Sequence, residues 1–359
     1  MSRKFIVTII TLFIIAAAAG LAIFFAKGYT FSTKERRVVG TGIITINSEP
    51  DSASVFVDGH LTTATNATIS SLPTKSYSIK ITKEGFIPWE RSVEVKEGLV
   101  SELKVTLFPA IPTVYPLTFN GVSSPVLSPD ASKLVYVAKA GKKPGIWVWT
   151  MAKNQPIAFT RSSEPHQIAN SSLADLSKVS FKWSPDSKQV LATVGNQNFL
   201  LNADSLNTEP KDITAILQAT LKGWEDDILA KETARVETIK DNKLKKIASD
   251  SAKLNWSPDE TKFMTDKRIY DLVDLKDFPL PSAKTHIWLP DSKHIILVED
   301  GSISIIDFDR TNDQKAVIYA GKFDDSLVFP WPDSSRLVII SSFPTPTASE
   351  PNFYGINLR

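Results

Sequence analysis

Hydrophobic and polar residues alternate in short runs over the first third of the chain, beginning at Gly42. A period of two is typical of strands that bury one face, and Pro, Gly, Asn and Asp interrupt it. The apolar positions are Ile44, Ile46, Val55, Val57, Ile79, Ile81, Val93, Val95, Leu103, Val105 and Leu107. The pattern predicts a small antiparallel β-sandwich over residues 42–109, with a positive φ at Gly85 in one of its turns.

The rest of the chain repeats one short phrase, in which an apolar residue stands one or two places before Pro-Asp, and a polar step and an apolar run follow. The copies are Leu127-Ser-Pro129-Asp130, Trp183-Ser-Pro185-Asp186, Trp256-Ser-Pro258-Asp259, Trp288-Leu-Pro290-Asp291 and Trp331-Pro332-Asp333. Recurrence at a few tens of residues indicates an array of similar units, here a β-propeller over residues 110–359. Residues 221–247 are interpreted as a degenerate blade, which gives six blades. Residues 114–119 are expected to pair with the last blade and close the ring.

The phrase itself predicts a tight turn between two strands. Pro fixes φ for the second position of a type I turn, and the Asp carboxylate then accepts hydrogen bonds from nearby backbone N–H groups. The aromatic residue two places before Pro, as in Trp183, Trp256 and Trp288, is expected to wedge between adjacent blades.

An uncharged, mostly apolar run occupies residues 5–26, which meets the ~20 residues that a membrane-spanning helix needs. Arg3 and Lys4 precede the run, which favours a cytoplasmic tail over residues 1–4, although basic residues also follow it. We therefore expect a single-pass transmembrane anchor over residues 5–26 and a linker over residues 27–41. A cleaved signal peptide with a site at residues 16–19 is the alternative.

Several short motifs give residues 42–109 a resemblance to the PEGA domain. They are Gly42-x-Ile-x-Ile-x-Ser48-Glu49-Pro50, Val55-x-Val57-Asp58-Gly59, Leu72-Pro73, Glu84-Gly85-Phe86 and Trp89. Thr62-Thr-Ala-Thr65 and Lys75-Ser76 depart from the usual pattern, so the loops at these points are expected to differ. The resemblance implies an envelope or surface protein of bacteria or archaea, with a binding or spacer role.

The repeated phrase is similar to the TolB-type, WD40-like propeller repeat. Members of that family usually have Gly after the Asp, whereas this chain has Ala131, Ser187, Glu260, Ser292 and Ser334. A type I turn tolerates this change, since it requires no positive φ before its last position. The resemblance implies a role as an accessory subunit of an envelope machine.

Composition narrows the range of functions. The chain has no Cys, which excludes disulfides, zinc–thiolate sites and thiol catalysis. The net charge of +2 is uneven, because the first 37 residues hold six basic side chains and one acidic one. The other 322 residues hold 35 basic and 38 acidic side chains and so lack the basic footprint of a nucleic-acid-binding protein.

Motifs for catalysis or cofactor binding are not found in the sequence. The four histidines, His60, His166, His286 and His294, have no metal-binding spacing, and there is no nucleophile elbow or phosphate-binding glycine loop. The positions of His286 and His294 on either side of the Trp288 phrase favour ordinary strand and turn roles over a shared metal. We expect no enzyme activity, no cofactor and no metal.

Loops on a rigid scaffold are where binding residues concentrate. Residues 161–177, rich in Ser, are interpreted as a long exit loop of the first blade, outside its strands. Its candidate recognition residues are Arg161, Glu164, His166 and Asn170.

The sequence thus predicts a single-pass envelope protein with most of its chain outside the cytoplasm. A PEGA spacer presents a propeller that binds a protein or cell-wall partner without catalysis, and the membrane is contacted through the N-terminal helix. Two alternatives stay open, namely a TolB-like accessory subunit and a propeller enzyme that cleaves glycans.

Overall fold

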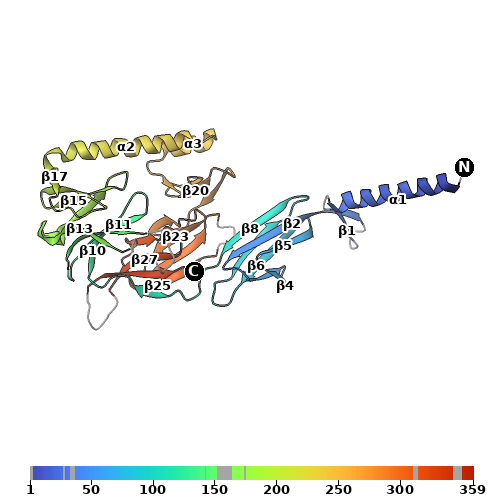
Figure 1. Cartoon of the computed structure of the whole chain (residues 1–359), viewed down its shortest axis with the longest axis horizontal. Helices are drawn as coiled ribbons and strands as arrows, with labels where there is room; N and C mark the ends of the chain where they lie inside the picture. Colours follow the sequence, from blue (N-terminus) through green and yellow to red (C-terminus); the bar gives the residue numbers. More distant parts are fainter. Residues whose placement is uncertain are drawn as a thin grey trace. The chain divides into compact units, whose positions relative to one another are not determined.

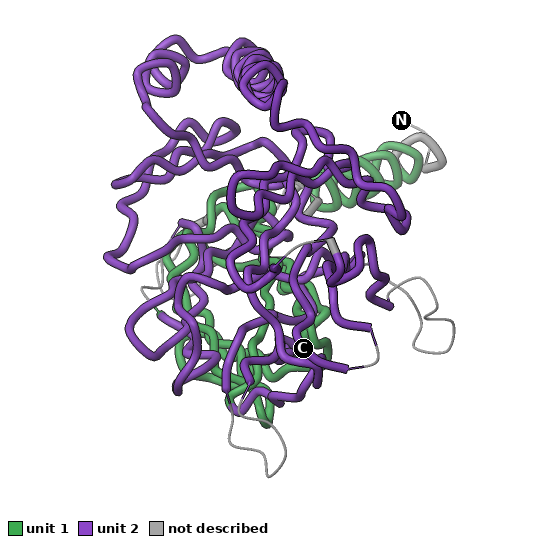
Figure 2. The backbone as a smooth tube through the Cα atoms, turned by 90° about the vertical axis from the view of Figure 1, so that its left-hand side faces the viewer, with its two compact units in different colours: residues 1–110, 311–314 green, residues 111–310, 315–359 purple. Residues whose placement is uncertain are grey.

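The computed structural model describes residues 3–26, 29–32, 37–141, 143–151, 164–173, 175–309, 314–342 and 350–359. The chain divides into two compact units, residues 1–110 with 311–314 and residues 111–310 with 315–359 (Figure 2). Each unit has its own hydrophobic core.

The first unit begins with helix α1 (Arg3–Ala26), which follows the apolar run. Large apolar side chains along it are exposed, including Leu12 at 69% and Phe13 at 73%. Among the residues that the structure describes, no helix is both long and apolar enough to cross a membrane. The structure therefore does not support the predicted transmembrane anchor over residues 5–26.

Two four-stranded sheets form the rest of the first unit. One contains β1 (Tyr29–Ser32), β2 (Arg37–Glu49), β5 (Ala67–Pro73) and β8 (Val100–Thr106), and the other runs β4 (His60–Ala64), β3 (Ser54–Val57), β6 (Ser76–Thr82), β7 (Trp89–Glu94). Their shared core includes Ile44, Ile46, Val55, Ile79 and Ile81, all fully buried.

The predicted alternation in this unit is confirmed, with one correction to its topology. Strand β8 pairs with β2 in parallel, with Ile43 opposite Val100, so the sandwich is not wholly antiparallel. The chain passes through the other sheet before it returns, which leaves room for a parallel crossover. Gly85 has a φ of 81°, as predicted for its turn.

The second unit is built from four-stranded antiparallel sheets that resemble propeller blades (Figure 1). Blade 1 is β10 (Val122–Leu127), β11 (Lys133–Ala138), β12 (Gly145–Thr150) and β13 (His166–Asn170). Blade 2 is β14 (Ser180–Trp183), β15 (Gln189–Val194), β16 (Gln197–Asn202) and β17 (Lys211–Asp212). Blade 3 is β18 (Asn255–Trp256), β19 (Lys262–Met264), β20 (Arg268–Asp271) and β21 (Lys276–Pro279). Blade 4 is β22 (Thr285–Trp288), β23 (His294–Glu299), β24 (Ser302–Asp307) and β25 (Ala316–Ala320).

Blade 5 takes its strands from both ends of the unit. It contains β26 (Val328–Pro330), β27 (Arg336–Ser341) and β28 (Asn352–Asn357), and its fourth strand is β9 (Val114–Pro116). Tyr115 lies opposite Gly355 in this pairing. The prediction that residues 114–119 complete the last blade is therefore confirmed.

The blade predicted over residues 221–247 is wrong, because these residues belong to two helices. Helix α2 (Leu217–Glu237) and helix α3 (Asn242–Asp250) follow blade 2 (Figure 1). Leu217, Leu221 and Trp224 recur at helical spacing and pack against blade 2, while no Gly or Pro interrupts residues 224–257. The described residues of this unit thus form five four-stranded sheets and not six.

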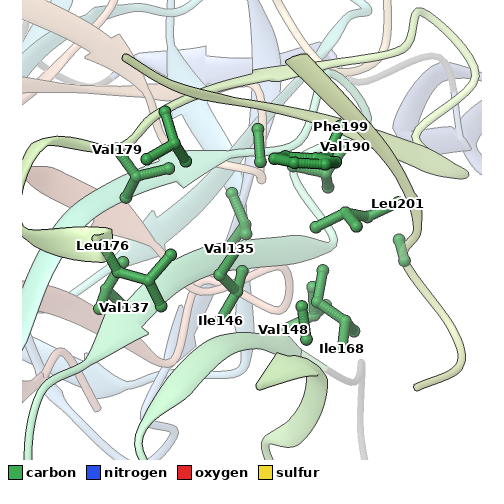
Figure 3. Packing of buried hydrophobic residues seen from close by; sticks show 14 of the residues in the cluster. Val135, Val137, Ile146, Val148, Ile168, Leu176, Val179, Val190, Phe199 and Leu201 are labelled. Carbon is green, nitrogen blue, oxygen red and sulfur yellow. The ribbon is translucent and has the colours of Figure 1, made fainter. Parts of the chain in front are cut away.

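Adjacent blades bury apolar side chains between them. Figure 3 shows the cluster in which Val135, Ile146 and Val148 of blade 1 lie close to Val190 and Leu201 of blade 2. A second cluster joins blade 5 to blade 1, where the rings of Trp331 and Trp149 meet edge to face at 5.5 Å. Blades 3 and 4 share a third.

Candidate binding site on the helical insert

The middle of the predicted recognition loop is a blade strand. Arg161 lies outside the described residues, and Glu164 is exposed just before strand β13. His166 begins β13, with its Nε2 atom 2.9 Å from the Ala203 carbonyl, and Asn170 ends it. The interpretation as a loop outside the strands is wrong, since Ile168 and Ala169 between them are fully buried.

The repeated Pro-Asp phrase forms the same turn in every blade. In blade 1 the Ala131 N–H donates to the Ser128 carbonyl at 2.8 Å, which closes a turn with Pro129 at its second position. Equivalent bonds close the turns that contain Pro185-Asp186, Pro258-Asp259, Pro290-Asp291 and Pro332-Asp333. The residue after each Asp has a φ between 55° and 60°, so the last turn position is left-handed even without Gly.

The Asp of each turn is held by short hydrogen bonds. The Asp186 carboxylate accepts from the Ser184 hydroxyl at 2.6 Å and from the Lys188 N–H at 3.1 Å. The bond from Ser184 is the main cause that lowers the pKa of Asp186. Asp130 and Asp259 accept equivalent bonds from Ser128 and Ser257. These carboxylates are bound within their own turns.

Neighbouring blades are joined directly through residues of this phrase. The indole N–H of Trp183 donates to the Val126 carbonyl of blade 1, and that of Trp288 donates to the Asn255 carbonyl of blade 3, both at 3.0 Å. The left-handed residue contributes as well, because the Asp130 N–H donates to the Ser187 hydroxyl oxygen across the junction. Asp259 and Ser292 repeat this bond between blades 3 and 4.

Between blades 2 and 3, helix α2 supplies the partners that a preceding blade supplies elsewhere. The indole N–H of Trp256 donates to the Glu232 carboxylate at 2.8 Å. Glu260, at the left-handed position of the blade 3 turn, forms an ion pair with Arg235, 2.8 Å away. Arg235 also pairs with Glu232, which ties the two substitutes together. The first part of α2 is fixed to blade 2 by Trp224, which is 8% exposed.

A groove lies along these helices. It has a volume of about 470 Å³ and is lined by α2, α3 and residues 251–254. Its apolar lining includes Ile228 and Leu229, which are 46% and 66% exposed, and Val236, Ala248 and Leu254. Glu225, Glu232 and Glu237 are the charged residues that line it. This combination suits a peptide-like partner better than a small polar ligand.

His294 lies in a buried carboxylate pair. Its Nδ1 is 2.6 Å from Asp291 and its Nε2 is 3.2 Å from Asp307, and the residue is 4% exposed. Burial alone would lower the pKa of His294, but the bonds to Asp291 and Asp307 outweigh it and raise the pKa to about 9. Burial raises the pKa of Asp291, and the hydrogen bond from His294 reverses this into a net decrease.

This histidine takes the place of the turn serine. Leu289 stands in blade 4 where blades 1, 2 and 3 have Ser, so the Asp291 carboxylate is bound by the imidazole instead. His286 is bound elsewhere, to the Pro281 carbonyl at 2.7 Å. Within the described ranges there is no group of His, Asp and Glu suited to a metal ion.

Sequence reasoning missed both the helical insert and the His294 pair. The insert was signalled by the three-and-four spacing of Leu217, Leu221 and Trp224 and by Asp241, which caps α3 through the Leu244 N–H. The Asp291-x-x-His294 spacing marks the pair, but its second carboxylate, Asp307, is adjacent only through strand pairing.

Comparison with known proteins identifies the first unit and gives likenesses for the second. Residues 41–111 match the PEGA domain. No curated protein matches the chain. A solved structure of TolB from Acinetobacter baumannii is 14% identical and aligns with 79% of this chain and 60% of its own, with a TM-score of 0.24. The chain thus spans less than two thirds of that protein.

Two further structures are similar in part. A putative TolB from Agrobacterium tumefaciens is 13% identical over 64% of this chain and 76% of its own, with a TM-score of 0.21. A luciferin-regenerating enzyme is 12% identical over 68% of this chain and 95% of its own, with a TM-score of 0.29. The blade arrangement described above therefore rests on the strand topology of this chain.

Proposed function

We propose that this chain is a non-catalytic binding protein of the cell envelope, whose propeller unit recognises a protein partner through the groove on α2 and α3. The exposed apolar lining of this groove is the observation that carries the proposal. Exposed apolar surface next to polar residues marks protein interaction sites. The envelope location is supported by the PEGA domain, since the family resemblance implies such a location.

The placement of the groove adds to this support. Helices α2 and α3 interrupt the series of blades and belong to no sheet. Their inner residues hold the insert to blades 2 and 3, and these contacts leave Ile228 and Leu229 facing solvent. A glycan-cleaving site gains no support from His294, because a substrate would need to reach a side chain that is 5% exposed.

Site-specific cross-linking in cells tests the proposal. A photoreactive amino acid at Leu229 should capture a discrete protein, whereas the same residue at Leu206, which is 47% exposed on blade 2, should not. Ile228→Ser in the cross-linker variant should weaken that capture while the unfolding transition stays unchanged. The absence of any product from Leu229, or the same products from both positions, would contradict the proposal.

A further inference from the structure

We infer that the partner segment bound in the α2–α3 groove is basic and amphipathic, with apolar side chains on one side and Lys or Arg beside them. This inference rests on the proposed function and names the chemistry of the partner. Two observations carry it together, namely the apolar lining and the negative sign of every charged side chain that lines the groove.

The apolar lining of the groove indicates a partner segment with an apolar side. Ile228, Leu229, Val236, Ala248 and Leu254 offer aliphatic surface with no aromatic side chain for stacking. A volume of about 470 Å³ lies in the range of pockets for small ligands and holds only a few side chains. An amphipathic helix laid in a groove inserts a few anchors at helical spacing and fits this size.

The charged residues that line the groove indicate the charge of the partner segment. No Lys, Arg or His is among the residues that line the groove. Glu232 and Glu237 are already paired, with Arg235 and with Lys245 at 2.8 and 2.6 Å. They can accept a partner's cation but do not require one.

The carboxylates at one end of the groove differ from Glu232 and Glu237 in their ion pairing. Glu225 lines the groove, and Asp226 and Asp227 follow it on α2, all three exposed. In the part of the chain that the structure describes, no ion pair involves any of them. Three adjacent carboxylates attract a cationic segment and repel an acidic one, most strongly at low ionic strength.

Defined peptides can test this chemistry on the full chain. The probe is a labelled amphipathic helix of about 18 residues made of Leu and Lys. One matched peptide has Glu at every Lys position and another has Gln, and binding is followed by fluorescence anisotropy. The Lys peptide should bind, with an affinity that falls as the salt concentration rises, and the Glu peptide should not bind.

Matched variants assign the binding to the groove. Leu229→Ser, and separately Glu225→Gln combined with Asp226→Asn and Asp227→Asn, should each weaken the Lys peptide about tenfold or more, or ~1.4 kcal/mol. The controls Leu206→Ser and Glu209→Gln, on exposed positions of blade 2, should bind as the parent does. Hydrogen exchange should slow in α2 and α3 when the peptide is bound.

The outcomes separate the two proposals. Equal binding of the Gln and Lys peptides, lost with Leu229→Ser, would overturn the basic partner and leave the groove as a binding site. Equal loss in the control variants would overturn the inference, because it would indicate general charge attraction. If no peptide binds and Leu229 captures no protein in cells, the proposed function fails as well.

Discussion

Blades 3 and 4 are joined by direct hydrogen bonds between their strands and turns, whereas blades 2 and 3 are joined through side chains of helix α2. At the first, Trp288 bonds a strand carbonyl, and the Ser292 hydroxyl bonds the turn backbone of the neighbouring blade. At the second, Trp256 and Glu260 use the side chains of Glu232 and Arg235 on a helix. A backbone carbonyl is fixed by its sheet, whereas a carboxylate at the end of a side chain must be ordered first. The helical junction should therefore be the weaker of the two.

Removal of the junction tryptophans should show this difference most strongly. Trp288 is 4% exposed within the shared core of blades 3 and 4, so Trp288→Ala should cost about 3–5 kcal/mol of unfolding free energy. Trp256 is only half-buried, and Trp256→Ala should cost about half as much. Chemical denaturation of the two variants beside the parent measures both. An equal or larger loss for Trp256→Ala would reverse the comparison.

The turn of blade 4 makes a pH-dependent contribution to the stability of the fold. The pKa of His294 is about 9 in the folded chain and 6.5 as its ordinary value. Its pairing therefore stabilises the fold fully below pH 6.5, and this contribution is lost as the pH rises through about 9. The difference between these two pKa values corresponds to about 3 kcal/mol of unfolding free energy.

Denaturation at several pH values between 6 and 10 measures this loss. His294→Gln should lower stability at pH 6 and flatten the fall at higher pH, because Gln does not titrate. Gln189→Asn, at the equivalent position of blade 2, is a control that leaves the slope unchanged, because it introduces no titratable group. If the unfolding free energy of His294→Gln falls with pH as steeply as that of the parent, groups other than His294 cause the fall.

The helical junction can be loosened without touching any blade. Glu232→Ala removes the acceptor of Trp256 and a partner of Arg235, and should cost about 1–2 kcal/mol. Amide exchange in α2 and α3 should accelerate, while exchange in blades 1 and 4 stays slow. Asp226→Ala, on the exposed face of the same helix, is the control and should change neither. Uniform acceleration through all blades would mean that the ring and the insert unfold as one unit.

The smallest expected effect concerns the left-handed turn position of blade 1. Ala131 has a φ of 55°, a region that costs an L-residue about 1 kcal/mol relative to Gly. Ala131→Gly should therefore raise the unfolding free energy by about 0.5–1 kcal/mol. Ala131→Val should lower it, because a β-branched side chain fits this region poorly. Thermal unfolding of both variants tests the sign, and a loss with Gly would mean that Ala131 packing outweighs strain.

The sequence predicted the elements whose signals are local. Alternation marked the two sheets around Ile44 and Ile79, and the Pro-Asp phrase marked each blade by one turn. Pairing of β9 with β28 was also predictable, since an extra strand before the first blade can supply the fourth strand of the last blade.

The elements that were not predicted depend on the period of short apolar runs and on contacts between residues far apart in the sequence. The expected repeat favours strands over residues 221–247, although the spacing of Leu221 and Trp224 is helical. The strand β13 lay inside a polar segment, where buried Ile168 and Ala169 give too short a run to be recognised. The carboxylate Glu232 became a partner of Trp256 only through the helix that the sequence analysis did not predict.

The pairing of β9 with β28 also has a consequence for the synthesis of the chain. Thr118 bonds to Asn352, which lies 234 residues later. At a translation rate of about 5–20 residues per second, roughly ten to fifty seconds pass before the ribosome delivers that partner. Until then β9 is an unpaired strand on a nascent chain, open to chaperones and to other unfinished chains. A product terminated before β28 keeps this strand exposed, so the same pairing distinguishes finished molecules from truncated ones.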